Sequence, residues 1–144
     1  MKKICLLLAL LTSLIAPAAF GQAVYGNNQS ILLASAARTA ATVNSTDQLN
    51  TVYKGGHFIV NISAYTAGTY TPHIQAKDPI SGNYYDILVG TALNATGTTI
   101  LKVYPGITAS ANAAASDLLP RTWRVQLIGA SANMTLSVSA FLEQ

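Results

Sequence analysis

The residues best suited to acid–base chemistry or metal binding are two histidines and a few carboxylates. His57 and His73 are the only histidines of the chain, and Asp78 and Asp86 flank one turn-forming segment. A metal site needs several His, Cys, Asp or Glu ligands at short spacings, and neither histidine has a second ligand at such a spacing. Paired carboxylates hydrolyse sugars, but Asp78 stands before a proline and a nearby glycine and is better explained as a turn residue. We therefore predict no metal site, and we expect both histidines at the surface or at a strand edge.

Motifs for nucleophilic catalysis and phosphate binding are missing as well. Serine is abundant, but the chain contains no Gly-x-Ser-x-Gly nucleophile elbow. The sequence Lys54-Gly55-Gly56 ends like a phosphate loop, yet it lacks the upstream glycine and the Ser or Thr after the lysine. The sequence thus predicts a non-enzymatic protein without catalytic residues or a cofactor. A hydrolase with a site assembled from distant residues is the least favoured alternative.

The remaining candidate residues are aromatic and basic side chains, which could contact a binding partner. Tyr84 and Tyr85 follow the turn, and Arg121 and Arg124 bracket Trp123. We identify Tyr84, Tyr85, Arg121 and Arg124 as candidate contact residues, because arginines next to strand ends either anchor a neighbouring protein or pair with an acid of the same chain.

Two structural interpretations compete with this contact role. The arginines are expected to pair with Asp117 or Asp86, which would make them strand-end caps. The rings could also form a carbohydrate-stacking platform, although alternate strand positions place some of them in the core. The rings in question are Tyr65, Tyr70, Tyr84, Tyr85, Tyr104 and Trp123.

The bulk composition favours one globular domain with a weakly charged surface. The chain has 144 residues, of which 51% are hydrophobic and 9% are charged. This length suits one ordinary domain, and so high an apolar content argues against disorder. A surface of small polar side chains is easily buried against a partner, because little charge must be desolvated.

The first 23 residues resemble a bacterial secretory signal peptide. Met1-Lys2-Lys3 precedes an apolar run that contains the only cysteine, Cys5, and small residues follow near Gln22. Beyond residue 23, six basic and five acidic residues leave a net charge of +1. No basic cluster remains for nucleic acid, which requires several phosphate-neutralising side chains on one face.

Period-two alternation predicts that the rest of the chain forms strands. Alternation of apolar and polar residues is typical of half-buried strands, with turn residues between them. In residues 57–65 we expect Phe58, Val60, Ile62 and Ala64 on the inner face, and Pro72 is expected at a strand start or an edge. Strands are expected at residues 57–65, 70–77, 84–89, 98–104, 123–128 and 134–142.

The expected fold is a single antiparallel β-sandwich of about seven or eight short strands. Its domain spans residues 31–144, after a signal-like segment at 1–23 and a linker or arm at 24–30. Residues 31–43 are favoured as an extended first strand, with a helix as the alternative. Residues 107–117 are expected to form a long loop with one helical turn.

Several short motifs resemble a family of small tailed-bacteriophage and prophage proteins. They are Arg38-Thr39-Ala40, Lys54-Gly55-Gly56, Gln75 to Asp86, Ala95-Thr96-Gly97-Thr98-Thr99, Val103-Tyr104-Pro105-Gly106 and Leu119 to Val125. The resemblance covers about residues 31–142. It implies a virion structural component of capsid-decoration or accessory type, with the major capsid protein or other virion proteins as partners and a homo-oligomeric state. It implies no catalytic residues.

The signal-like segment is a departure from this family. A secretory leader is unexpected on a protein that assembles onto a capsid in the cytoplasm, unless the apolar segment is retained as an arm that adds a strand to neighbouring capsomers. The alternative is a secreted or periplasmic binding module, such as an adhesin or a carbohydrate-binding domain.

Overall fold

A computed structural model describes residues 26–144, and they form strands, turns and loops without a helix. The signal-like segment expected at 1–23 lies outside the described residues. The eight strands are β1 (Asn28–Arg38), β2 (Thr42–Asn44), β3 (Gln48–Leu49), β4 (Gly55–Lys77), β5 (Tyr84–Val89), β6 (Gly97–Val103), β7 (Ala114–Ala115) and β8 (Thr122–Glu143). The all-β prediction is therefore confirmed.

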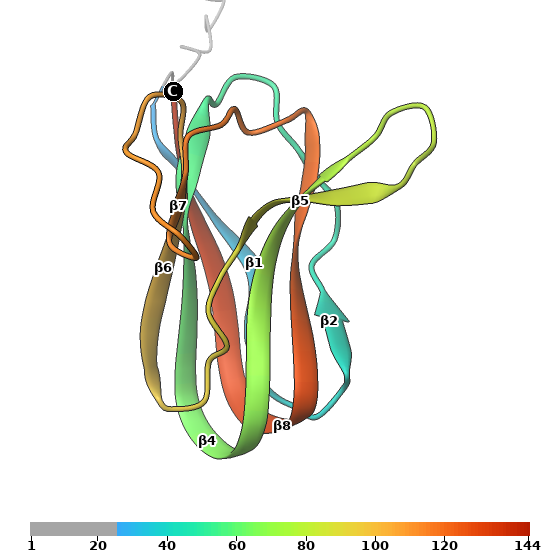
Figure 1. The fold of residues 1–144 in the computed structure, drawn as a ribbon, viewed down its shortest axis with the longest axis vertical. Helices are drawn as coiled ribbons and strands as arrows, with labels where there is room; N and C mark the ends of the chain where they lie inside the picture. Colours follow the sequence, from blue (N-terminus) through green and yellow to red (C-terminus); the bar gives the residue numbers. More distant parts are fainter. Residues whose placement is uncertain (1–25) are drawn as a thin grey trace, which may run out of the picture.

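The two longest strands, β4 and β8, form one antiparallel ribbon that folds back on itself. Their pairing runs from Gly55 opposite Glu143 to Ala76 opposite Trp123. β4 descends on the left of the view, bends at the bottom and rises toward β5, and β8 follows the same path in the opposite direction (Figure 1). The register breaks several times within residues 62–69 of β4, at this bend. Bulges of this kind bend a strand and increase its twist.

Gly68 and Ser131 give the bend its backbone geometry. Gly68 has a φ of +73° and Ser131 a φ of +49°, in the left-handed region that glycine adopts without steric cost. A Cβ atom on Gly68 would lie 2.2 Å from the carbonyl oxygen of Ser131. The two strands therefore approach so closely at the bend that only glycine fits at position 68.

Folding the ribbon back places two halves of the sheet face to face. The first layer contains β1, the C-terminal half of β8, the N-terminal half of β4, and β6 with the short parallel strand β7. The second layer contains β2 and β3, the N-terminal half of β8, the C-terminal half of β4, and β5. The result is the predicted sandwich, built from one continuous sheet.

The core lies between the two layers, and most of the predicted inward positions are buried. A direct contact across the layers joins Phe58 to Trp123, whose rings meet edge to face at a centroid distance of 5.3 Å. Such pairs contribute about 1 kcal/mol beyond their burial. The largest fully buried side chains are Trp123, Tyr70, Phe58, Ile74, Leu101, Leu127, Met134, Leu136, Val60, Val103, Val125 and Val138.

The alternation in β8 changes phase at the bend. Buried positions are odd-numbered from Trp123 to Leu127 and even-numbered from Met134 to Leu142. The bend of β8 contains one extra residue, at the place where Ser131 has a positive φ. Because of this extra residue, the apolar side chains of both halves of β8 face the same core. A strand without this shift would expose one half of its apolar residues.

Tyr70 ties the connection between β1 and β2 to the core. Its ring is fully buried, and its hydroxyl donates a hydrogen bond of 2.8 Å to the carbonyl of Ala40. Burial raises the pKa of Tyr70. The N–H of Gly129 donates to the carbonyl of Ala41, and a Cβ at position 129 would lie 2.7 Å from the Tyr70 ring. These contacts fix the crossing from the first layer to the second.

Strand lengths differ from the prediction at the bend. The expected strands at 57–65 and 70–77 are one strand, as are those at 123–128 and 134–142, because the ladder continues through the bend. Ala64, predicted to face inward, is exposed because it lies in the bend. The residues that appeared to end a strand in these segments thus form a bend within one continuous strand rather than a loop between two strands.

The remaining differences are local. Pro72 is in the interior of β4 rather than at its start. This is tolerated because the Pro72 carbonyl accepts a hydrogen bond from the N–H of Gly90, and no hydrogen bond from the nitrogen of Pro72, which carries no N–H, is needed in return. β1 begins at Asn28, inside the segment expected as a linker. Residues 31–43 contain no helix, as favoured, but they are not one strand, because β1 ends at Arg38 and β2 starts at Thr42. The loop at 107–117 contains the predicted single turn of helical type, in which the N–H groups of Ala113 and Ala114 both donate to the Ser110 carbonyl, and it ends in the short strand β7, which was not predicted. β1 pairs with β8, and its register shifts twice between Ile31 and Ala36.

The bend allows a matched test of the two effects at Gly68. We expect Gly68→Ala to lower the free energy of unfolding by about 3 kcal/mol, from roughly 1–2 kcal/mol for the left-handed backbone and a similar amount for the clash. Gly82 has the same φ of +73° but open space around it, so Gly82→Ala should cost only about 1–2 kcal/mol. Urea denaturation of both variants measures the difference, and equal losses would contradict a steric role for the bend.

Candidate functional site

The hairpin between β4 and β5 extends beyond the sandwich (Figure 1). Its turn is organised by Asp78, whose carboxylate accepts from the N–H groups of Ile80 and Ser81 and from the Ser81 hydroxyl. The backbone closes the turn with bonds from Asp78 to Asn83 and from Gly82 to Asp78. The turn role predicted for Asp78 is confirmed, and the projecting turn has a defined shape.

The end of this hairpin is apolar. Ile80 is 95% exposed and Tyr85 is 56% exposed, and Pro79 is exposed beside them. We call Pro79, Ile80 and Tyr85 the apolar tip. A single exposed hydrophobic residue needs no explanation, but here Pro79 and Ile80 lie on a turn held by the hydrogen bonds of Asp78, and Tyr85 follows near the start of β5.

The root of the hairpin is fixed by Tyr84 and Arg124. The Arg124 guanidinium lies over the Tyr84 ring at 3.4 Å from its centroid, and Arg124 Nε donates 2.9 Å to Gln75 Oε1. The Tyr84 hydroxyl donates 2.6 Å to Asp47 Oδ1. Lys77 Nζ lies 2.8 Å from Asp47 Oδ2. One arginine and one carboxylate thus hold β5 against β4, β8 and the chain after β2.

A chain of amides extends this network over the outer face of the second layer. Gln75 Nε2 donates to Asp86 Oδ1 at 2.9 Å and to Gln126 Oε1 at 3.2 Å. Gln126 Nε2 in turn donates to Asn44 Oδ1 at 2.9 Å. Gln75 lies on the outer face of the sheet but is buried under these neighbours. Each of these hydrogen bonds joins a different pair of strands, so the network stiffens the whole layer.

The electrostatics of the network favour ionised carboxylates. Hydrogen bonds from Lys77 and Tyr84 hold the pKa of Asp47 below its usual value. The Ser81 hydroxyl and the N–H groups of the turn hold the pKa of Asp78 below its usual value as well. The hydrogen bond to Asp47 raises the pKa of Lys77. All of these groups are largely exposed, so the electrostatic gain is modest.

His73 lies beside a carboxylate of the neighbouring strand. Its Nδ1 lies 3.0 Å from Asp86 Oδ2, in the arrangement in which a carboxylate orients a catalytic histidine. No serine, threonine or cysteine side chain bonds to His73 within residues 26–144, and the pair lies on the outer face of the sheet. His57 is 3.9 Å from Glu143. The sequence did not reveal the His73–Asp86 pair because the two residues meet only through the β4–β5 register, which contains a bulge.

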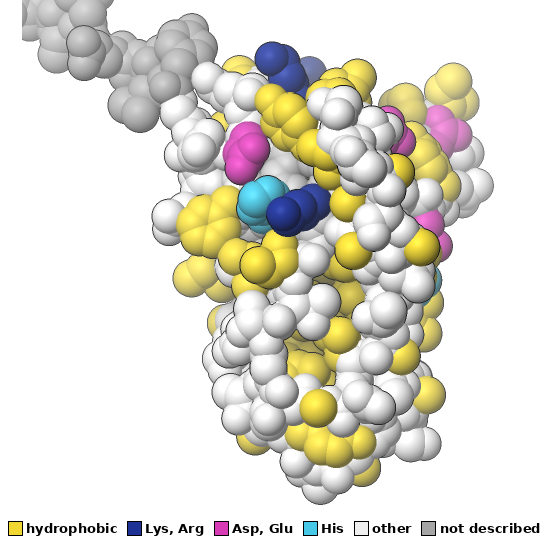
Figure 2. All heavy atoms as spheres, turned by 60° about the vertical axis from the view of Figure 1, so that its left-hand side comes forward, with side chains coloured by type: hydrophobic (Ala, Val, Ile, Leu, Met, Phe, Trp, Pro, Cys, Tyr) yellow, Lys and Arg dark blue, Asp and Glu magenta, His cyan; other side chains and the backbone are white. Residues whose placement is uncertain are grey.

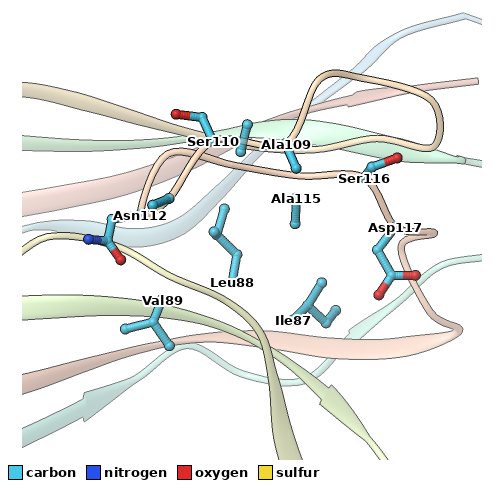
Figure 3. Close-up of a pocket in the computed structure, with 11 residues that line it drawn as sticks. Ile87, Leu88, Val89, Ala109, Ser110, Asn112, Ala115, Ser116 and Asp117 are labelled. Carbon is cyan, nitrogen blue, oxygen red and sulfur yellow. The ribbon is translucent and has the colours of Figure 1, made fainter.

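A hollow of about 530 Å³ opens beside the root of the same hairpin. Figure 3 shows it between β5, which contributes Ile87, Leu88 and Val89, and the segment 109–117. Ala109, Ala115 and Leu88 point into the hollow, while Asn112 and Asp117 stand at its two ends. We call this hollow the β5 groove. Nothing in the spacing of these residues predicted it, because the segment 109–117 contains only small side chains and reads as loop.

The outer face of the first layer carries a second apolar surface. Ile31, Ser139, Ile59 and Ile100 are paired in one row across four strands, and Ile31 is 78% exposed. In the next row, His57 lies between Phe141 and Lys102. Figure 2 shows hydrophobic side chains beside a histidine and a basic side chain on one face. Outer faces of antiparallel sheets are usually polar.

The structure separates the four predicted contact residues. Tyr84 and Arg124 are in direct contact, whereas Tyr85 lies on the hairpin outside the network and Arg121 is exposed before β8. Neither arginine forms an ion pair with Asp117 or Asp86 in the described part of the chain. That pairing was wrong, because Arg124 reaches Asp86 only through Gln75.

The aromatic residues do not form one platform. Tyr70 and Trp123 are fully buried, and one face of Tyr84 is covered by Arg124. The Tyr104 hydroxyl is bound to the backbone of Gln144, away from the hairpin. A sugar-stacking surface needs several accessible rings side by side, and this geometry does not supply them.

Comparison of the chain with protein-family models, with curated proteins and with solved structures finds no match. Residues 26–144 contain no helix of the length and hydrophobicity needed to cross a bilayer, and they gather no group of three or more metal-ligating side chains. The function must therefore be inferred from the residues of the chain and their geometry.

The two arginines provide a matched test of the hairpin root. We expect Arg124→Ala to raise amide hydrogen-exchange rates of β5 about tenfold, because the stacking on Tyr84 and the bond to Gln75 together contribute roughly 1–2 kcal/mol. Arg121→Ala should leave these rates unchanged, since its side chain is outside the network. Hydrogen exchange of the two variants is measured by mass spectrometry and compared with that of the wild type. Equal effects of the two substitutions on β5 would contradict the proposed role of the root.

The lowered pKa values of Asp47 and Asp78 predict a loss of stability in acid. Because both carboxyls hold their protons more weakly in the folded state, their contribution is full above the ordinary Asp pKa of about 4. It is lost as the pH falls through the lowered folded-state values. The free energy of unfolding should therefore decline below about pH 4, and Asp47→Asn should flatten this decline. An unchanged pH slope in the variant would contradict the assignment.

Proposed function

We propose that the protein is a non-enzymatic bacteriophage structural protein, of capsid-decoration or accessory type, that works through contacts with the major capsid protein, other virion proteins or copies of itself. The observation that carries the proposal is the projecting β4–β5 hairpin, with its apolar tip and its fixed root. A rigid apolar projection on a sandwich suits docking better than catalysis, because ordering costs are already met in the free protein.

The motifs behind the phage resemblance coincide with this hairpin. The segment from Gln75 to Asp86 is the hairpin itself, and the segment from Leu119 to Val125 supplies Trp123 for the core and Arg124 for the root. The resemblance therefore falls on residues with a structural task. This supports a role in presenting the hairpin to a partner.

The surface chemistry supports protein partners rather than nucleic acid. Lys77 is paired with Asp47, and Arg124 is stacked on Tyr84, so the hairpin face presents no cluster of free cations for phosphates. Elsewhere, the exposed charges, such as Lys54, Lys102 and Arg121, stand among apolar side chains and small hydroxyl and amide groups. Little charge must be desolvated when such surfaces are covered.

The test is the location and mass of the chain after infection or prophage induction. We expect the chain in washed particles, at a constant copy number across preparations, when measured by intact-mass spectrometry with a non-structural phage protein as the negative control. A chain found only in the free supernatant, with its N-terminus near Gln22 or Val24, would overturn the proposal and favour the secreted binding module. Its mass also reports whether residues 1–23 are retained.

A further inference from the structure

We propose that a second copy of this chain covers the outer face of the first layer, about a twofold axis that runs along the strands between β8 and β4. The inference deepens the proposed function, on whose premise of action through protein contacts it rests, by naming the surface and the partner. It follows from the apolar row across this face, from the area of the face, and from charges that match when two copies face each other.

An apolar row crosses the middle of the face. Ile31 of β1, Ile59 of β4 and Ile100 of β6 lie in register with Ser139 of β8. Ile31 is 78% exposed and Ile100 is 46% exposed, and Phe141 in the next row is 37% exposed. Contiguous apolar side chains open to water on a folded protein mark an interaction surface. The row therefore indicates that this face is covered in the working protein.

The face is large enough to hold two copies together. Neighbouring strands lie about 4.8 Å apart, and successive outward residues of one strand lie about 6.8 Å apart. Four strands and four rows, which run from Glu143 to Ser137 along β8, thus have a flat footprint of about 500 Å². Two such footprints together remove about 1,000 Å² from water, which is the size at which a contact becomes a specific interface. Ile31, which is strongly exposed, adds to this area.

The charges of the face are divided by its midline, the line between β8 and β4. Glu143 lies on the β8 side, whereas His57 of β4 and Lys102 of β6 are paired with each other in register on the other side. Figure 2 shows an acidic side chain, a histidine and a basic side chain close together beside hydrophobic side chains. Lys102 is exposed, and it forms no ion pair within residues 26–144. Its charge is therefore available to a partner.

A twofold axis along the midline makes the face complementary to itself. The axis exchanges the β8 side of one copy with the β4 side of the other, so Glu143 of one copy lies over His57 and Lys102 of the other. The same operation brings Ile31 of β1 onto Ile100 of β6, because these two strands lie at equal distances from the midline and the two residues share a row. Apolar groups thus meet apolar groups, and the acid meets the bases.

The charges select this axis over the other twofold axis that a flat face allows. An axis across the strands would place Glu143 over the hydroxyl rows near the bend, among Ser137 and Thr135, where no base lies opposite it. The axis along the strands gives an isologous contact, which closes at two copies. The β4–β5 hairpin belongs to the second layer, so each copy of the pair keeps its hairpin free for other partners.

Exchanging the charges tests the partner and the axis together. In Lys102→Glu an acid faces Glu143 of the other copy, and in Glu143→Lys a base faces Lys102. Each full-length variant alone should dissociate at least about tenfold more readily than wild type, because like charges that meet across an interface are strongly disfavoured. In an equimolar mixture every such contact joins an acid to a base, so heterodimers should form with about the wild-type affinity. Sedimentation velocity over a range of concentrations measures all four samples.

Two exposed isoleucines provide the matched control. Ile31→Glu places a charge in the apolar row and should abolish the dimer, whereas Ile80→Glu, on the hairpin of the second layer, should leave it intact. Both side chains are highly exposed, so both variants should fold, and far-ultraviolet circular dichroism checks this. Wild type that stays monomeric up to its solubility limit, charge variants that fail to complement, or equal effects of the two isoleucine variants would each overturn the inference.

Cross-linking gives an independent readout of the axis. In a Cys5→Ser background, Ile31→Cys mixed with Ile100→Cys should give at least about ten times more dimer with a short bis-maleimide than Ile31→Cys alone. The two copies of position 31 lie on opposite sides of the axis, three strand spacings or about 14 Å apart. Equal yields from the two samples would overturn the axis. A monomeric Ile31→Cys sample that resists labelling by a maleimide would assign the face to residues 1–25 of the same copy and would overturn the second copy as its occupant.

These outcomes are separable from those of the particle measurement. A chain present in washed particles whose charge variants fail to complement overturns the twofold contact and leaves the virion role standing. A chain that forms the twofold pair but is absent from particles overturns the virion role and leaves the contact standing.

Discussion

The fold depends on the return of one β ribbon onto itself. The two layers of the sandwich are the two halves of the pairing between β4 and β8, and the contact of Phe58 with Trp123 is formed only when those halves face each other. The bend tolerates this because Gly68 supplies a left-handed backbone at the point of closest approach and Ser131 shifts the phase of β8. The other strands add to edges that this ribbon creates.

The same ribbon links the core to the projecting hairpin. Within a few residues, β4 contributes Ile74 and Ala76 to the core, Gln75 to the outer network and Lys77 to the hairpin root. Alternation along one strand therefore couples the packing of the interior to the orientation of the exposed turn. A perturbation of the Arg124–Tyr84 contact changes the hairpin without opening the core, because the network lies on the opposite side of the sheet.

The sequence predicted what is set locally and missed what depends on register. Alternating residues such as Phe58, Val60 and Ile62 reveal strands and their inner faces, and the Asp78 turn is encoded within six residues. The continuation of β4 through residues 62–69 was not predicted, because bulges and turn residues have the same composition as loops. The pairing of His73 with Asp86, and the stacking of Arg124 on Tyr84, require knowledge of which strands are neighbours. The β5 groove is formed by small side chains that have no distinctive pattern.

The pairing of β1 has a consequence for how the chain matures. Asn28 lies opposite Leu142, and among the strands of residues 26–144 β1 pairs with β8 alone. β1 therefore cannot join the sheet before β8 has been made, and neither can the ribbon of β4 and β8 that forms both layers. Folds dominated by such distant pairings form slowly. During synthesis, the emerging polypeptide therefore has little native structure to gain until β8 has left the ribosome.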